Sequence, residues 1–202
     1  MPTMSALTAN EAAAASRIPL KQVHRIIDAG LLDGAVDTRD GTRMIEADGL
    51  LALKLAYVTA DLLKPAARRR AVLRLLSEPD SAVIRDHVVT VEVAAIGADL
   101  ESGLADLDAA RVMVATDPDI LGGTPCFAGT RVPVHDIAER LAQGDATEDL
   151  LADHPALDAE RLRLAVVYAA AYPRRGRPPV PPWRSGRPVS REVLRLDDLP
   201  VA

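Results

Sequence analysis

The stretch DPDILGGTPCFAGTRVPV, residues 117–134, has the composition of a tight strand–turn–strand. Three glycines and three prolines fall within its eighteen residues. Glycine adopts backbone angles that are closed to other residues, and proline fixes strand edges and stops pairing. We therefore expect a short β-hairpin here, in which Gly122, Gly123, Gly129, Thr130, Arg131 and Pro133 serve the architecture of the turn.

Three helices are predicted directly after this hairpin. Apolar residues recur with helical spacing at about 134–143, 147–153 and 158–171. Thr147 and Asp158 stand where N-caps are favoured. An ion pair of Arg131 with Asp117 or Asp136 is a candidate for fastening the hairpin to the helices. The region 116–172 is thus expected to be a small helical domain, similar to a helix-turn-helix and opened by a β-hairpin.

The same region resembles a known family. The matching features are the 117–134 stretch, Gly144, the run TEDLL at 147–151, the run HPAL at 154–157 and a helix through residues 168–169. On these residues the region resembles the domain-of-unknown-function 433 family, found in bacterial antitoxins of the VapB type and their relatives. The resemblance implies an antitoxin of a type II toxin–antitoxin pair, with a PIN-domain ribonuclease as its toxin and its own operon as the target of repression.

The composition limits the fold and the compartment. The chain has 202 residues, of which 49% are hydrophobic and 2% aromatic, so its cores must consist of Ala, Leu and Val. This favours a mainly α fold with small β elements (α+β). The net charge of −5 permits a local basic face but not a surface that coats nucleic acid. The single Cys126, the lack of a membrane-spanning apolar run and the lack of a signal-peptide pattern predict a cytoplasmic protein without membrane contact.

Residues 1–78 have the pattern of a winged helix-turn-helix. Thr8 and Glu11 form a capping-box signature, and Pro19 suits the start of a second helix that ends at Gly30. Residues 37–43 are predicted to be a tight hairpin, followed by helices at 47–63 and 66–76. This order resembles the winged module of MerR-like and excisionase-like regulators.

That resemblance implies contacts with operator DNA. In such modules the second helix enters the major groove and the wing touches phosphates, which assigns the groove to Lys21, Gln22, His24 and Arg25 and the wing to Arg39 and Arg43. Arginine and glutamine offer paired donors to base edges. The alternative is a plain helical hairpin with solvated polar residues. A basic cluster of Lys64, Arg68, Arg69, Arg70 and Arg74 fits either a DNA-backbone contact or a solvated helix face.

Residues 79–115 are expected to connect the two domains. The β-branched run at 87–93 predicts a strand, residues 98–110 a short helix, and residues 111–114 another strand.

The tail, residues 173–202, differs in kind from the rest. It holds seven of the fifteen prolines, seven arginines and the only tryptophan. Such a segment buries too little surface to fold alone, but it can become ordered along a partner. The antitoxin resemblance implies that the tail wraps the toxin and inserts an arginine among its metal-binding carboxylates, with Arg175, Arg177, Trp183, Arg184 and Arg187 as the toxin-binding residues. The alternative is a basic linker with no dedicated partner.

Two other classes of function remain as alternatives. An effector-responsive transcription regulator without a toxin would need a ligand pocket, and the scarcity of aromatic residues argues mildly against a cage for a cation. An enzyme would have to use a pair such as Cys126 and His135, but no general-base pattern surrounds either residue. His24, His87, His135 and His154 lack metal-ligand spacing, so no metal or cofactor is expected. A homodimer is expected, because operators read by such modules are usually palindromic.

Overall fold

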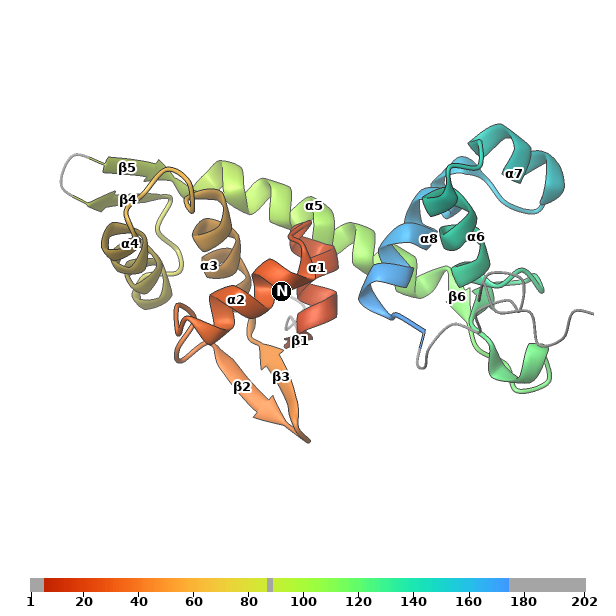
Figure 1. Ribbon diagram of the computed structural model, residues 1–202, viewed down its shortest axis with the longest axis horizontal. Helices are drawn as coiled ribbons and strands as arrows, with labels where there is room; N and C mark the ends of the chain where they lie inside the picture. The colour runs from red at the N-terminus through yellow and green to blue at the C-terminus, as the bar shows by residue number, and fades with distance from the viewer. Residues whose placement is uncertain (1–5, 87–88, 175–202) are drawn as a thin grey trace, which may run out of the picture.

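The structure is a computed structural model that describes residues 6–86 and 89–174, and its fold class is α+β, as predicted (Figure 1). Within these residues it contains eight α-helices and three small antiparallel sheets. The first helices and sheet lie at one end of the molecule, the last three helices lie at the other, and one long helix runs between them (Figure 1).

The N-terminal part begins with two short helices and a sheet. Its elements are β1 (Leu7–Thr8), α1 (Ala9–Ser16), α2 (Leu20–Asp28), β2 (Val36–Arg39) and β3 (Thr42–Ile45), and the strand order is β1-β3-β2. The predicted capping box is confirmed, because Thr8 accepts a hydrogen bond from the Glu11 backbone and the Glu11 carboxylate accepts one from Thr8. The predicted hairpin is also confirmed. It turns at Asp40 and Gly41, both with positive φ, and projects from the body of the molecule (Figure 1).

Two further helices complete this part, α3 (Ala47–Val58) and α4 (Pro65–Ser77). The predicted helix 47–63 ends early, at Val58. The chain then forms a turn in which the Leu62 and Leu63 amides donate to the Thr59 carbonyl, and Pro65 begins the next helix. Most residues of α3 are buried, among them Lys54, whose ammonium group lies 2.8 Å from the Asp99 carboxylate and also bonds the Ser16 carbonyl.

The segment after α4 differs from its prediction. The expected strand at 87–93 is present as β5 (Val89–Glu92), but it pairs in a hairpin with β4 (Val83–Asp86), which was not predicted. The expected short helix is the twenty-residue α5 (Val93–Val112), and the expected strand at 111–114 is reduced to β6 (Val114–Ala115). The helix is longer because its buried residues recur every three to seven positions and pack against α1, α3 and α8.

The C-terminal part contains β7 (Cys126–Phe127), α6 (Val134–Gln143), α7 (Thr147–Asp153) and α8 (Ala159–Ala171). The three predicted helices are confirmed, and Asp158 caps α8 by accepting a hydrogen bond from the Arg161 backbone. Thr147 is not an N-cap, since Ala146 occupies that position without a side-chain bond. The hairpin predicted within residues 117–134 is only partly formed, since Cys126 and Pro133 make a single isolated bridge there. The ladder pairs β7 with β6, which lies before this stretch, and a short 3-10 turn, η1 (Leu121–Gly123), lies between the two strands.

Two hydrophobic cores result. The larger lies among α1 to α5 and includes Leu50, Leu53 and Leu107. The smaller joins β7 to α6, α7 and α8 through Phe127, Ile137, Leu150 and Leu162. Helix α8 belongs to both, because its last residue, Ala171, packs into the larger core.

Candidate nucleic-acid interface and partner groove

Helix α2 presents a polar face to solvent. Val23 and Ile26 are buried against the larger core, whereas Lys21, His24 and Arg25 are exposed. Gln22 is half-buried on the same helix. Lys21 and Arg25 form no ion pair with any other residue that the structure describes. The four residues predicted to face the DNA groove thus share one helix, and three of them are open to solvent.

The two arginines predicted for the wing are engaged with carboxylates. Arg39 lies 2.5 Å from Glu46 and 3.3 Å from Asp37, and Arg43 lies 2.5 Å from Asp28 on α2. All these side chains are 42–61% exposed, and ion pairs at such exposure contribute only about 0–1 kcal/mol. A phosphate could therefore replace a carboxylate partner at little cost. The sequence did not reveal these pairs, because Asp28 and Glu46 lie outside the hairpin.

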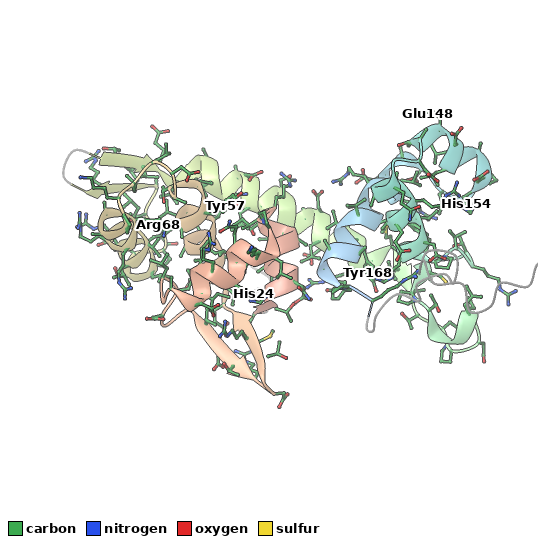
Figure 2. All side chains as sticks on the ribbon, viewed as in Figure 1. His24, Tyr57, Arg68, Glu148, His154 and Tyr168 are labelled. Carbon is green, nitrogen blue, oxygen red and sulfur yellow. The ribbon has the colours of Figure 1, made fainter. Side chains whose placement is uncertain are left out.

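A polar hollow of about 550 Å³ lies beside α2, between α3 and α4. Gln22, Arg25, Tyr57, Asp61 and Arg68 are among the residues that line it. The Arg68 Nε is buried, and no hydrogen-bond partner for it lies within the described part of the chain. His24, Tyr57 and Arg68 all lie in the N-terminal part of the molecule (Figure 2). The hollow thus brings one member of the predicted basic cluster to the helix predicted to read DNA.

The other members of the basic cluster do not line this hollow. Arg74 donates to the Arg85 carbonyl, at a nitrogen–oxygen distance of 2.5 Å, and Lys64 and Arg69 are exposed.

Charge divides unevenly between the two ends of the chain. Residues 1–78 contain eleven lysines and arginines against nine aspartates and glutamates. Residues 134–171, which form α6 to α8, contain three arginines against eight acidic residues. The C-terminal helices therefore repel phosphate, whereas the N-terminal part attracts it weakly.

A second hollow, of about 820 Å³, lies between the 117–134 stretch and the end of α8. Residues 121–125 line one side, and His135, Tyr168 and Tyr172 line the other. The His135 and Tyr168 rings meet edge to face with their centroids 5.7 Å apart, and the Tyr168 and Tyr172 centroids lie 4.9 Å apart. Two of the three tyrosines of the chain thus line one hollow, which the low aromatic content did not suggest.

An apolar hollow of about 450 Å³ adjoins it and shares His135, Pro173 and Arg174 with it. The further lining consists of Ala138, Glu139, Ala142, Val166, Ala169 and Ala170 on the faces of α6 and α8. We call the two hollows together the α6–α8 groove. Tyr168, which lines the larger hollow, lies on α8 in the C-terminal part, whereas His24 lies on α2 in the N-terminal part (Figure 2).

Tyr172 connects this groove to the N-terminal part. Its hydroxyl donates to Glu11 at 2.6 Å and accepts from the Arg111 Nε at 2.7 Å, while its carbonyl lies 2.7 Å from the His135 Nε2. Burial of Glu11 acts to raise its pKa, but the hydrogen bonds from Tyr172, Thr8 and Arg111 outweigh burial and lower the pKa below its ordinary value. The carboxylate is therefore held in its charged form at the junction of α1, α5 and α8.

Cys126 is buried inside β7, and its thiol donates to the Thr124 carbonyl at 3.3 Å. Burial raises the pKa of the thiol, and the negative charge of Asp136 raises it further. The protonated thiol is a weak nucleophile at neutral pH. His135 is turned to Tyr172 instead. The structure therefore gives the Cys126–His135 pair no nucleophilic geometry.

The glycines of the 117–134 stretch have an architectural role, since Gly122, Gly123 and Gly129 all have positive φ. Arg131 is exposed and forms no ion pair with the described residues. Asp136 pairs with Arg174 rather than with Arg131, so the expected ion pair is wrong.

The five residues predicted to bind a toxin, Arg175, Arg177, Trp183, Arg184 and Arg187, lie outside the described residues, as does His87. Residues 6–86 and 89–174 contain no group of three or more His, Cys, Asp or Glu side chains arranged to hold a metal ion. None of the helices in these ranges is long and apolar enough to cross a membrane.

Comparison with known proteins gives three findings. Residues 114–169 match the family described as "Protein of unknown function (DUF433)". The chain is 38% identical to the uncharacterized protein y4eO of Sinorhizobium fredii (strain NBRC 101917 / NGR234) over 184 residues. This alignment covers 85% of this chain and 83% of y4eO. The crystal structure of Rv2018 from Mycobacterium tuberculosis aligns over 79% of this chain and 96% of that one, with 16% identity and a TM-score of 0.31, which is too low to indicate a shared fold.

Proposed function

Since the chain belongs to the family of y4eO and matches the DUF433 family over residues 114–169, we propose that it is the antitoxin of a type II toxin–antitoxin pair. In this proposal a MerR-like winged helix-turn-helix, α1 to β3, binds operator DNA and represses the operon. The tail neutralises a toxin, which we take to be a PIN-domain ribonuclease. The protein acts as a cytoplasmic homodimer and catalyses no reaction.

The observation that carries the DNA-binding role is the polar face of α2. Lys21, His24 and Arg25 are exposed on a helix whose opposite side is fixed by buried Val23 and Ile26. A helix held in this way can enter the major groove, which is about 12 Å wide, and present its donors to base edges. Neither Lys21 nor Arg25 has to leave an ion pair with another described residue to do so.

Basic residues on either side of α2 support contacts with the phosphate backbone of DNA. The hairpin β2–β3 carries Arg39 and Arg43, whose exposed carboxylate partners can give way to phosphate. On the other side, Arg68 reaches the hollow beside α2 with a buried nitrogen that still lacks a partner among the described residues. Phosphate contacts of this kind position a protein on the duplex.

The acidic character of α6 to α8 assigns a different role to the C-terminal helices. Eight acidic residues against three arginines disfavour a phosphate backbone, so we propose that these helices contact protein rather than DNA. The proposal thus assigns protein contacts, and not DNA contacts, to the helices whose sequence is similar to a helix-turn-helix.

The toxin-neutralising role is supported by the family resemblance and by the composition of the tail. Arginine meets clustered carboxylates through paired hydrogen bonds, so an arginine inserted into a nuclease site can exclude the divalent ion that the nuclease needs. Tryptophan and arginine are also the residues that contribute most to interface energies.

The alternative, an effector-responsive regulator without a toxin, is favoured by one observation. The α6–α8 groove contains the aromatic-lined hollow that such a protein would use for its effector. The two functions differ in genetic behaviour, because only an antitoxin protects cells from a neighbouring gene product.

The test is co-expression of the neighbouring gene with either the full chain or a chain truncated after Arg174, at equal protein levels. We expect the neighbouring product alone to arrest growth and cleave RNA, and the full chain to restore growth. The truncated chain should bind the operator but give no protection. Equal protection by both forms would remove the tail from the mechanism, and a harmless neighbouring product would favour the regulator.

A further inference from the structure

The α6–α8 groove combines two kinds of surface. One half carries the contacting rings of His135, Tyr168 and Tyr172, and the other half is lined mainly by alanines together with Val166, which is 49% exposed. The halves meet at Pro173 and Arg174, the last two described residues. An occupant of the whole groove must therefore offer apolar rings to tyrosines at one end and a larger apolar side chain to the alanines at the other.

A polyproline segment meets these requirements. Grooves lined by aromatic residues bind extended proline-rich segments, because proline rings pack on aromatic faces and the segment has little conformational entropy left to lose. Such grooves also supply donors to the carbonyl groups of the segment. Tyr168 is half-buried in the groove, and its hydroxyl has no hydrogen-bond partner among the described residues, so it is available as such a donor.

The chain itself contains a segment with this chemistry. Residues 178–183 read PPVPPW, with four prolines followed by Trp183. They follow directly on the groove, since Arg174 already lines it and pairs with Asp136 and Glu139. Charge is complementary as well, because the tail has seven arginines against three acidic residues, while residues 134–171 are acidic.

We propose that residues 178–183 of the same chain dock in the α6–α8 groove, with the prolines on Tyr168 and Tyr172 and the indole of Trp183 on Ala138, Ala142 and Val166. The chain can return to the groove through Gly176. Trp183 lies nine positions after Arg174, a span of roughly 28 Å in the polyproline II conformation. The proposal does not depend on the antitoxin role. It adds that any partner of the tail competes with the groove for the same residues.

Trp183 is the only tryptophan, so its fluorescence in the full-length protein reports the tail alone. We expect acrylamide to quench Trp183 several-fold less efficiently in the folded protein than in a peptide of residues 175–190. Val166→Arg should bring quenching close to the peptide value, because a long cation in the apolar half excludes the indole and repels the tail. Val58→Arg, at an exposed valine on α3 far from the groove, is the matched control and should leave Trp183 protected.

Tyr168→Ala is the second variant, with circular dichroism to verify that it folds, and it should also expose Trp183. The experiment is repeated over a hundred-fold dilution. Protection that persists on dilution supports docking within one chain, whereas protection lost on dilution would assign the groove to the tail of a second copy and overturn the proposal. Quenching equal to that of the peptide in the wild type, or unchanged in both groove variants, would likewise overturn it.

Discussion

Tyr172 joins three parts of the chain that lie far apart in sequence. Its hydroxyl bridges Glu11 and Arg111, and its carbonyl meets His135. The Glu11 carboxylate is only 12% exposed and also accepts hydrogen bonds from Thr8. The bonds at this carboxylate are charge-assisted and shielded from water, which makes them stronger than the exposed ion pairs of the hairpin.

We therefore expect Tyr172→Phe to lower the free energy of unfolding by about 1–3 kcal/mol, because it removes the hydroxyl between two charged groups. Tyr57→Phe is the matched control and should have little effect, since no hydrogen bond of the Tyr57 hydroxyl occurs in the described structure. Urea denaturation of the three proteins measures the difference. Equal losses in both variants would show that the hydroxyl at position 172 has no special role.

Glu11 also predicts a pH dependence. Its pKa is lowered in the folded protein, so the unfolded chain binds a proton more readily, and the stabilisation is present at neutral pH and lost as the pH falls. Wild type should be more stable than Glu11→Gln near pH 7, and the difference should shrink below the ordinary glutamate pKa of about 4.3. Denaturation of both proteins at a series of pH values tests this, and a pH-independent difference would contradict it.

At the scale of elements, the close contact between α1 and α5 depends on one glycine. A Cβ at Gly103 would lie 1.9 Å from the Ala15 carbonyl oxygen, which is backbone and cannot move aside alone. Gly97 lies on the same helix, and a Cβ there would meet nothing within 4 Å. The two positions therefore separate the packing of the helix from its intrinsic propensity.

Gly103→Ala should destabilise the protein by about 1–3 kcal/mol or more, because the helices must separate. Gly97→Ala should stabilise it by up to about 1 kcal/mol, because alanine favours a helix interior. Thermal melts of both variants provide the comparison. A wild-type melting temperature for Gly103→Ala would show that α1 and α5 do not approach as closely as the Gly103–Ala15 contact requires.

Sequence predicted those elements whose signals are local. The Thr8–Glu11 capping box, the Asp40–Gly41 turn and the Asp158 cap depend on neighbouring residues, and all three are present. The length of α5 was underestimated, because its first residue, Val93, continues a β-branched run that resembles a strand. The ends of the helix depend on contacts with α1, α3 and α8, which the sequence does not reveal. The α6–α8 groove was missed because the fold alone brings residues 121–136 to residues 166–174.

At the scale of the whole molecule, the two ends differ in charge and are coupled in structure. The N-terminal part has a small excess of basic residues, α6 to α8 are acidic, and α5 and α8 link the two hydrophobic cores. The proposed DNA contact thus lies in the N-terminal part and the proposed tail groove in the C-terminal part of one framework (Figure 1). The hydrogen bonds of Tyr172 connect the two parts. The exposed polar face of α2 could be predicted because its residues follow helical spacing, but the ion pairs of Arg39 and Arg43 could not.

The role of the hairpin is tested by the salt dependence of DNA binding. Arg43→Ala should weaken binding to all sequences alike, and it should reduce the slope of log K against log salt by about 0.9, the value for one phosphate contact. An unchanged slope would mean that Arg43 keeps its ion pair with Asp28 in the complex.

The most direct test of the central claim, that α2 reads operator DNA, is a fluorescence anisotropy titration of a duplex from upstream of the protein's own gene. Wild type, Arg25→Ala and Arg131→Ala are compared on this duplex and on a scrambled one of equal length. Each variant removes one exposed arginine, but only Arg25 lies on the polar face of α2. We predict that Arg25→Ala loses about 1–3 kcal/mol on the operator and much less on the scrambled duplex, while Arg131→Ala binds like wild type. Equal operator binding by all three proteins, or no preference of the wild type for the operator, would contradict the claim.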